Sequence, residues 1–357
     1  MNRLYEIDVL RFLAAISVVF YHFTYRAYQS DNLSPINYQF LGKITRYGWL
    51  GVELFFVISG YVVLMSAERK TVRQFFVSRI VRLYPAFWIS CTLTAVIVKL
   101  LGAPKHISVL QVHLADYLIN MTMLVDFLGK GGRIDAAYWS LAYEIVFYFL
   151  ISIIIGFRLL NRLSLLLMIW LAYVAFVGPS PEIQTLFTKL LIPDYAPYFI
   201  SGMVFYMFQY KKDAEWKLWT LLTISFVLCL RSMVFYKEEL EKSFHDENAF
   251  SLSVLIAFLC LIFIVFFIII NRKFVLPERK LISIAGAITY PLYLIHGHIG
   301  YVIYQHIGDL VDKYVLLLII VIAFIFVSYM IHILIEKPLS KPFLQFINRC
   351  IDKWIVA

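Results

Sequence analysis

Ionisable residues stand inside long apolar runs of this sequence, where a charge is costly unless it has a partner or a function. They are Arg11, His22, Glu53, Glu144, Arg231, His296, His298, His332 and Glu336. A histidine with a carboxylate partner is a typical general base, because the carboxylate orients the ring and stabilises the imidazolium. This combination predicts proton transfer in an apolar environment.

Arg11 and His22 belong to one apolar run and are eleven positions apart. In an α-helix this spacing is three turns plus about 20°, so both side chains leave the same face, about 16 Å apart along the axis. One helix face would then present a fixed positive charge near one end and a titratable imidazole toward the other. A structural interpretation stays open, in which Arg11 reaches the membrane interface and His22 is hydrogen-bonded in the core.

Three further residues are predicted to share the depth of this imidazole. Counting from the predicted entry points of their helices places Glu53, Glu144 and His296 in the same outer half of the membrane. Either carboxylate would then be able to orient the histidine ring. The alternative is that each carboxylate caps a helix or pairs with a loop arginine, Arg46 or Arg133.

A second group of charged residues falls on the other side of the membrane. Arg79 and Arg82 are three apart, hence neighbours on a helix face, and they precede Pro85 at the mouth of an apolar run. Two guanidiniums suit bidentate contacts with phosphate. Ordinary positive charge of a cytoplasmic loop is the alternative. Glu336 is expected to pair with Arg11 or Arg82 in a structural role.

The composition requires a lipid environment for these groups. Of 357 residues, 62% are hydrophobic and 15% are charged, whereas soluble domains contain about 25% charged residues. This excludes a soluble globular, a disordered or a fibrous repeat protein. The net charge of +9 fits Lys and Arg in cytoplasmic loops, so we expect a lipid bilayer and no nucleic acid as partner. The four cysteines form no CxxC pair, and we expect neither a disulfide framework nor a metal site.

Ten apolar runs have the length of membrane-spanning helices. They cover about residues 7–27, 48–66, 84–101, 138–156, 163–178, 195–210, 216–236, 250–270, 281–305 and 314–335. We predict an all-α polytopic membrane protein of about ten transmembrane helices, with one transmembrane domain over residues 1–357 and a short cytoplasmic tail at 336–357. The distribution of Lys and Arg places both termini in the cytoplasm.

Several ordered motifs make the chain similar to the acyltransferase-3 family of integral membrane acyltransferases, over about residues 5–340. The motifs are Arg11-x10-His22, GWLGVELFFVISGY at 48–61, Arg79-x-x-Arg82-Leu-Tyr-Pro85, Tyr138-Trp-Ser-Leu-Ala-Tyr-Glu144, Tyr290-Pro-Leu-Tyr-Leu-Ile-His296 and Glu336-Lys-Pro338. Each motif alone is weak, whereas their order and spacing are specific. Small residues in the second motif, such as Gly60, are expected to let helices approach closely.

The resemblance implies transfer of an acyl group, usually acetyl, from cytoplasmic acyl-CoA to a hydroxyl of an exported glycan or lipid-linked saccharide, O-antigen among them. It implies that His22 is the essential histidine, that Arg11 is its motif partner and that Glu144 is the motif acid. Arg79 and Arg82 match the family's basic motif. Acetyl-CoA or another acyl-CoA would be the donor, with no permanently bound cofactor, in a bacterial inner membrane.

The residue-level reading and the resemblance predict one site. Its catalytic residues would be His22, Glu144, Arg11, Glu53 and His296, and its acyl-CoA phosphates would bind Arg79, Arg82 and Arg11. Neutral His22 would take the proton of the acceptor hydroxyl, and an acyl-imidazole intermediate stays open.

Two points stay open in this prediction. His296 is followed by Gly297-His298, where the family is expected to have proline or another apolar residue, so the role of His298 is undefined. A transporter or flippase with a buried proton-coupled path is the alternative function. The sequence shows no inverted repeat or matching interrupted helices of the kind found in transporter folds.

Overall fold

The structure of the chain is a computed structural model that describes residues 4–29, 33–102, 107, 110–129, 131–179 and 185–356. All regular elements in this part of the chain are helices, which confirms the predicted all-α class. The first three residues and the last one lie outside the described residues. The predicted cytoplasmic location of both termini therefore stays a prediction.

Most of the predicted spans are present as long helices. Eight helical stretches within the described residues are long and apolar enough to cross a membrane, and together they confirm a polytopic membrane protein. They are Tyr5–Gln29, Gln39–Ala67, Val72–Leu101, Ala136–Gly156, Leu159–Val177, Glu215–Phe244, Leu252–Ile270 and Lys313–Lys353.

Two predicted spans differ from the expectation. The run at 195–210 forms α11 (Ala196–Gln209), which has only 14 residues. The run at 281–305 is divided into α14 (Lys280–Ile295) and α15 (Gly297–Ile307), with a bend at His296 between them. Hydropathy reports how apolar a segment is but not whether its helix is continuous, so the division was not predicted.

The chain folds into two compact units, each built from segments that are distant in the sequence. The first unit contains Met1–Ile7, Leu50–Val72 and Val146–Glu278. The second unit contains Asp8–Trp49, Arg73–Ile145 and Arg279–Ala357.

In the first unit, helices α4 and α11 lie backbone against backbone. A Cβ atom on Gly60 would come within 1.9 Å of the Phe199 carbonyl oxygen, and one on Gly202 within 1.9 Å of the Val57 carbonyl oxygen. This close approach confirms the packing role predicted for Gly60. The helices of this unit are α4 (Gly51–Ala67), η5 (Leu159–Arg162), α9 (Leu163–Val177), α10 (Leu186–Leu191), α11, α12 (Glu215–Phe244) and α13 (Leu252–Ile270).

The second unit contains most of the short helices and the bend at His296. Its elements are η1 (His22–Arg26), α2 (Ala27–Gln29), α3 (Gln39–Thr45), α6 (Leu114–Asn120), α7 (Val125–Leu128), η4 (Ala136–Tyr138), α14, α15, α16 (Lys313–Ile331), η6 (His332–Glu336) and α17 (Lys337–Val356). Four further helices run across the division between the units, namely α1 (Tyr5–Tyr21), η2 (Arg46–Leu50), α5 (Val72–Leu101) and α8 (Trp139–Gly156).

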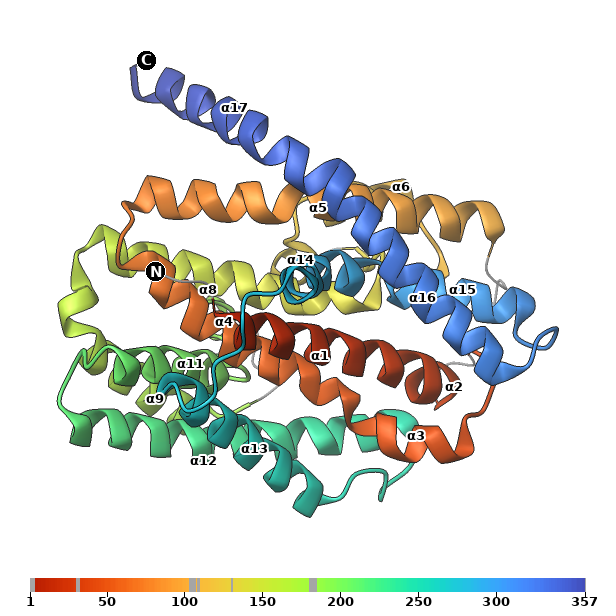
Figure 1. Ribbon diagram of the computed structural model, residues 1–357, viewed down its shortest axis with the longest axis horizontal. Coiled ribbons are helices and arrows are strands. Elements are labelled where there is room, and N and C mark those ends of the chain that lie inside the picture. The colour runs from red at the N-terminus through yellow and green to blue at the C-terminus, as the bar shows by residue number, and fades with distance from the viewer. Residues whose placement is uncertain are drawn as a thin grey trace. The chain divides into compact units, whose positions relative to one another are not determined.

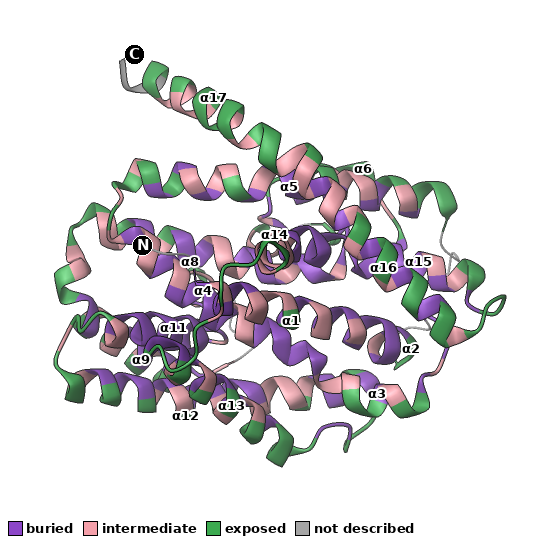
Figure 2. Ribbon diagram, in the orientation of Figure 1, coloured by how far each residue is buried: buried purple, intermediate pink, exposed green. Residues whose placement is uncertain are grey.

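The C-terminal part of the second unit is one continuous helical rod. Figure 1 shows α16 passing through η6 into α17, which ends at the C-terminus. Asp312 caps the start of α16, and its Oδ1 accepts hydrogen bonds from the amides of Tyr314 and Val315, at 3.0 and 3.1 Å. The segment predicted as a tail is thus helical, and Figure 2 shows α17 largely exposed.

Candidate active site

His22 lies at the start of a single π-helical turn, η1. Helix α1 is regular through Tyr21, so the spacing between Arg11 and His22 is that of an α-helix. The amide of Ala27 then bonds to the His22 carbonyl, five residues back instead of four. Such turns are rare and often occur at functional sites. The His22 side chain is buried in the second unit.

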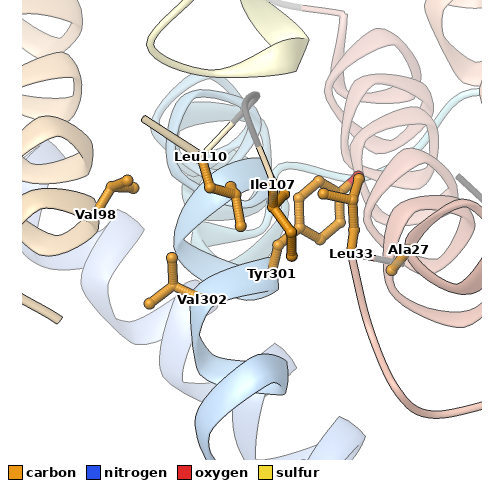
Figure 3. Packing of buried hydrophobic residues seen from close by; sticks show 7 residues of the cluster. All are labelled: Ala27, Leu33, Val98, Ile107, Leu110, Tyr301 and Val302. Carbon is orange, nitrogen blue, oxygen red and sulfur yellow. The ribbon is translucent and has the colours of Figure 1, made fainter. Parts of the chain in front are cut away.

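One ring nitrogen of His22 is held by a tyrosine. Nδ1 of His22 makes a short hydrogen bond with the Tyr301 hydroxyl, and the Arg26 guanidinium donates to the same hydroxyl. The Tyr301 ring is fully buried in an apolar cluster, drawn in Figure 3. Its members are Ala27, Leu33, Val98, Ile107, Leu110, Tyr301 and Val302. This packing fixes the hydroxyl and therefore the orientation of the imidazole.

A second imidazole lies against the first. The ring centroids of His22 and His296 are 4.9 Å apart in an edge-to-face arrangement. Nδ1 of His296 is 2.8 Å from the Tyr293 carbonyl oxygen. Because a carbonyl can only accept, Nδ1 of His296 carries the proton, and Nε2 of the neutral ring is an acceptor. This Nε2 is buried and has no hydrogen-bond partner among the described residues.

A buried carboxylate lies behind this pair. Asp135 is fully buried, and its charge acts on His296. Oδ1 of Asp135 accepts from the Ala137 amide at 2.9 Å, and Oδ2 accepts from the His298 amide at 2.8 Å. Burial raises the pKa of the Asp135 carboxyl, whereas His296 and the two amide donors act in the opposite direction.

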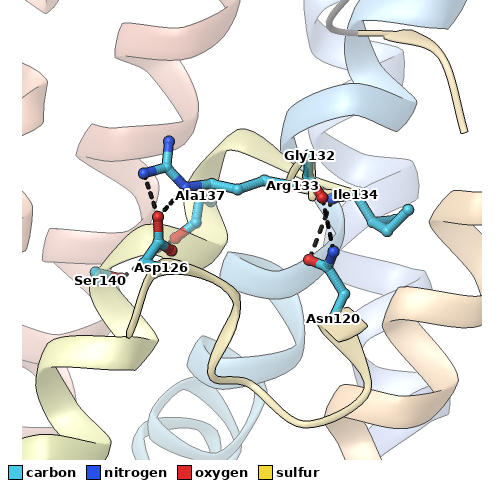
Figure 4. Close-up of polar contacts among 7 residues, drawn as sticks. All are labelled: Asn120, Asp126, Gly132, Arg133, Ile134, Ala137 and Ser140. Carbon is cyan, nitrogen blue, oxygen red and sulfur yellow. Dashed lines mark hydrogen bonds and ion pairs between the residues drawn. The ribbon is translucent and has the colours of Figure 1, made fainter. Parts of the chain in front are cut away.

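The loop before Asp135 is ordered by its own polar contacts (Figure 4). The Asn120 side chain donates to the Gly132 carbonyl at 2.8 Å and accepts from the Ile134 amide at 3.2 Å. Arg133 forms an ion pair with Asp126. These contacts order the loop and bring Asp135 to the start of η4, which leads into α8.

The predicted carboxylates have different environments from Asp135. Glu53 belongs to the first unit, where its side chain is buried and its Oε2 has no partner among the described residues. Glu144 lies in α8, in the second unit, and is half-buried. Arg133, one of the loop arginines considered for Glu144, pairs with Asp126. The carboxylate in the described contacts of the histidine cluster is Asp135.

The two arginines of the basic motif are not equivalent. Both lie in α5, which starts well before Pro85 and continues through it. Arg79 is buried and stacks on the Phe75 ring, with 5.1 Å between the guanidinium carbon and the ring centroid. Arg82 is exposed.

The carboxylate of Glu336 has a histidine partner. His332 Nδ1 and Glu336 Oε2 are 2.7 Å apart in the π-helical turn η6. The hydrogen bond comes from His332, which the sequence did not predict as the partner, and the charge of Arg82 also acts on this carboxylate.

Sequence reasoning missed three residues of the histidine cluster, namely Asp135, Tyr301 and Arg26. Asp135 had a usable signal, because it directly precedes a predicted helix and aspartate is a favoured N-cap. Tyr301 and Arg26 carried no comparable signal. Within the described residues no group of three or more His, Cys, Asp or Glu is arranged to hold a metal ion.

The sequence of the chain is similar to known acyltransferases. The acyltransferase domain family matches residues 4–333. The chain is 26% identical over 308 residues to ORF330 of Acidianus two-tailed virus, whose name attributes acetyltransferase activity to it, and the match covers 83% of this chain and 84% of that protein. No solved structure matches the chain.

Two cellular relatives match over shorter regions. O-acetyltransferase OatA of Staphylococcus aureus is 30% identical over 199 residues, which is 52% of this chain and 28% of OatA. Acyltransferase MdmB of Streptomyces mycarofaciens is 27% identical over 173 residues, which is 48% of this chain and 43% of MdmB. The match to these two therefore spans less than half of their length. Since the family match extends over nearly the whole chain, this membrane protein belongs to the acyltransferase-3 family of integral membrane acyltransferases.

Proposed function

We propose that this acyltransferase moves an acetyl or other short acyl group from cytoplasmic acyl-CoA to a hydroxyl group of an exported glycan or lipid-linked saccharide, in a bacterial inner membrane. The names of two relatives, an acetyltransferase and an O-acetyltransferase, support the acyl group and the hydroxyl acceptor. The observation that supports the chemistry best is the buried pair of His22 and His296.

In the proposed reaction, His22 is the proton acceptor. Its Nδ1 is bonded to the Tyr301 hydroxyl, so Nε2 faces the reacting groups. The acceptor oxygen forms a bond to the thioester carbonyl carbon, and the carbon–sulfur bond breaks. The hydroxyl proton passes to Nε2 of His22 and then to the departing thiolate, so that CoA leaves as the free thiol.

His296 has the second role in this proposal. The His296 ring packs edge-to-face against the His22 ring, and in this way it holds the base in position for the transfer. Asp135 adds a negative charge behind His296. In this proposal Asp135 is a further candidate for the supporting carboxylate, beside the Glu53 and Glu144 that the sequence predicted.

Acyl-CoA is proposed to bind through its phosphates at the basic motif. Arg82 is exposed and available for phosphate, and Arg79 lies one helical turn earlier on α5. Arg11 is the third candidate. The pantetheine arm would bridge a distance of about 16 Å, the spacing of Arg11 and His22 along a regular helix.

The test compares the acyl content of surface glycans in cells that express the wild type or His22→Ala at matched membrane abundance. A sugar ester that appears with the wild type and is lost with the variant is the expected result, and it would also identify the acceptor. Purified wild-type protein should release free CoA from acetyl-CoA. Full transfer by a folded His22→Ala protein would overturn the mechanism, and no turnover by the wild type would overturn the function.

A further inference from the structure

The bend at His296 is built around a glycine and an aspartate. Helix α14 ends at Ile295 and α15 begins at Gly297. A Cβ atom on residue 297 would come within 2.2 Å of Asp135 Oδ1, so only glycine allows the carboxylate to lie at this position. The close approach of Asp135 therefore requires the glycine at the interruption of the helix.

Two segments are joined reciprocally at this bend. The Asp135 carboxylate accepts the amide hydrogen of His298, at 2.8 Å. In return, Nε2 of the His298 ring accepts the amide hydrogen of Ala136, at 3.2 Å. Both side chains are buried. We call this pair of hydrogen bonds between residues 135–136 and residue 298 the clip.

The clip lies directly beside the ring that it would position. His296 is two residues before His298, and its Nδ1 bonds to the carbonyl of Tyr293. The hydroxyl of Tyr293 in turn donates to the Ala137 carbonyl at 3.0 Å, at the same end of α8. The chain is thus tied to residues 135–137 on both sides of His296, and the His296 ring is held beside that of His22.

We infer that Asp135 and His298 are positioning residues for acyl transfer, because the clip holds the His296 ring in its edge-to-face contact with the His22 ring. The inference rests on the proposed function. It assigns a role to His298. It also makes Asp135 the supporting carboxylate, which acts on His296 and not directly on His22.

Two substitutions act on the clip at different atoms. Asp135 uses both oxygens, one for each amide, and an asparagine has only one acceptor oxygen. Asp135→Asn must therefore lose either the clip bond from the His298 amide or the bond from the Ala137 amide that orients the carboxylate. His298→Leu removes the acceptor for the Ala136 amide, whereas His298→Gln retains an acceptor at a similar distance from the backbone. Comparison of His298→Leu with His298→Gln distinguishes the effect of losing the acceptor atom from the effect of losing the imidazole ring.

Asp312 provides a matched control for Asp135. A single oxygen of Asp312 accepts both amides at the start of α16, so Asp312→Asn keeps the cap. The same chemical change is therefore expected to preserve activity at 312 and to reduce it at 135.

The experiment measures kcat and KM for acetyl-CoA, together with amide hydrogen exchange of residues 297–301. Asp135→Asn and His298→Leu are expected to lower kcat about 10- to 100-fold with KM unchanged and to speed exchange in this segment. His298→Gln and Asp312→Asn should resemble the wild type. Full kcat in both clip variants, or equal loss in His298→Gln and His298→Leu, would overturn the inference alone. A wild type without turnover would overturn the proposed function and this inference with it.

Discussion

The two units bury different kinds of residue. In the first unit every residue of α11 from Ala196 to Met207 is buried, and glycines allow α4 and α11 to approach closely. In the second unit the buried residues include three histidines and an aspartate, together with the hydrogen bonds that orient them. The first unit is thus closely packed, and the second contains the groups proposed for catalysis. Substitutions should therefore affect stability in one and catalysis in the other.

The largest effect is expected for His22→Ala in the second unit. Loss of a positioned proton acceptor should lower kcat by about 10²- to 10⁴-fold. The ring is buried and bonded to the Tyr301 hydroxyl, so its loss should also cost about 1–3 kcal/mol in the free energy of unfolding, too little to account for this loss of turnover in a folded protein. Turnover and thermal unfolding are measured on the same preparation. A variant that is unstable but still active would contradict the comparison between the two units.

The reverse pattern is expected for Gly202→Ala in the first unit. The added methyl group would lie 1.9 Å from a backbone oxygen, and overpacking of this kind costs about 1–3 kcal/mol in the free energy of unfolding. Gly156→Ala is the control, because its nearest neighbour is a Val72 methyl group at 3.4 Å. Denaturant unfolding in detergent should separate the two variants. Equal stability would show that α4 and α11 are not closely packed.

A smaller effect is expected for Tyr301→Phe. The substitution removes the hydroxyl that bonds to His22 and keeps the packed ring. A hydrogen bond of this kind contributes about 1 kcal/mol, which is roughly fivefold in kcat. Tyr304→Phe in the same helix is the control, because its hydroxyl contacts Tyr38. If both variants lose the same activity, the Tyr301 hydroxyl has no special role.

The smallest effect is expected for Glu53→Met in the first unit. A buried carboxyl oxygen without a partner costs free energy, and an apolar side chain of similar length should raise the stability by up to about 1 kcal/mol. The melting temperature would report this gain. A lower melting temperature would show that Glu53 makes a stabilising contact, and the transfer rate of the variant would test its predicted part in catalysis.

The sequence predicted the long helices well, since about 20 consecutive apolar residues signal a span on their own. It did not predict the bend at His296. That bend depends on Asp135, more than 160 residues earlier, and a local pattern cannot report a contact between such distant residues. The apolar run at 281–305 has the length of one span, and only the contact with Asp135 shows where it is divided.

The candidate site was predicted in part. Apolar surroundings identified His22 and His296, and the structure brings their rings together. The same criterion, an ionisable residue within a span, selected Glu53 and Glu144. It did not select Asp135, because this residue precedes a span. Helical spacing placed Arg79 and Arg82 on neighbouring positions but could not predict that one is buried and the other exposed.

The π-helical turn at residues 22–26 has a consequence for the comparison of relatives. A π turn holds one more residue than an α turn, so deletion of one residue here would restore a regular helix and leave the following residues facing as they do now. A relative with an uninterrupted α-helix should therefore show a single-residue gap just after its histidine. In such a relative the histidine and the residue equivalent to Arg26 would be one position closer in the sequence.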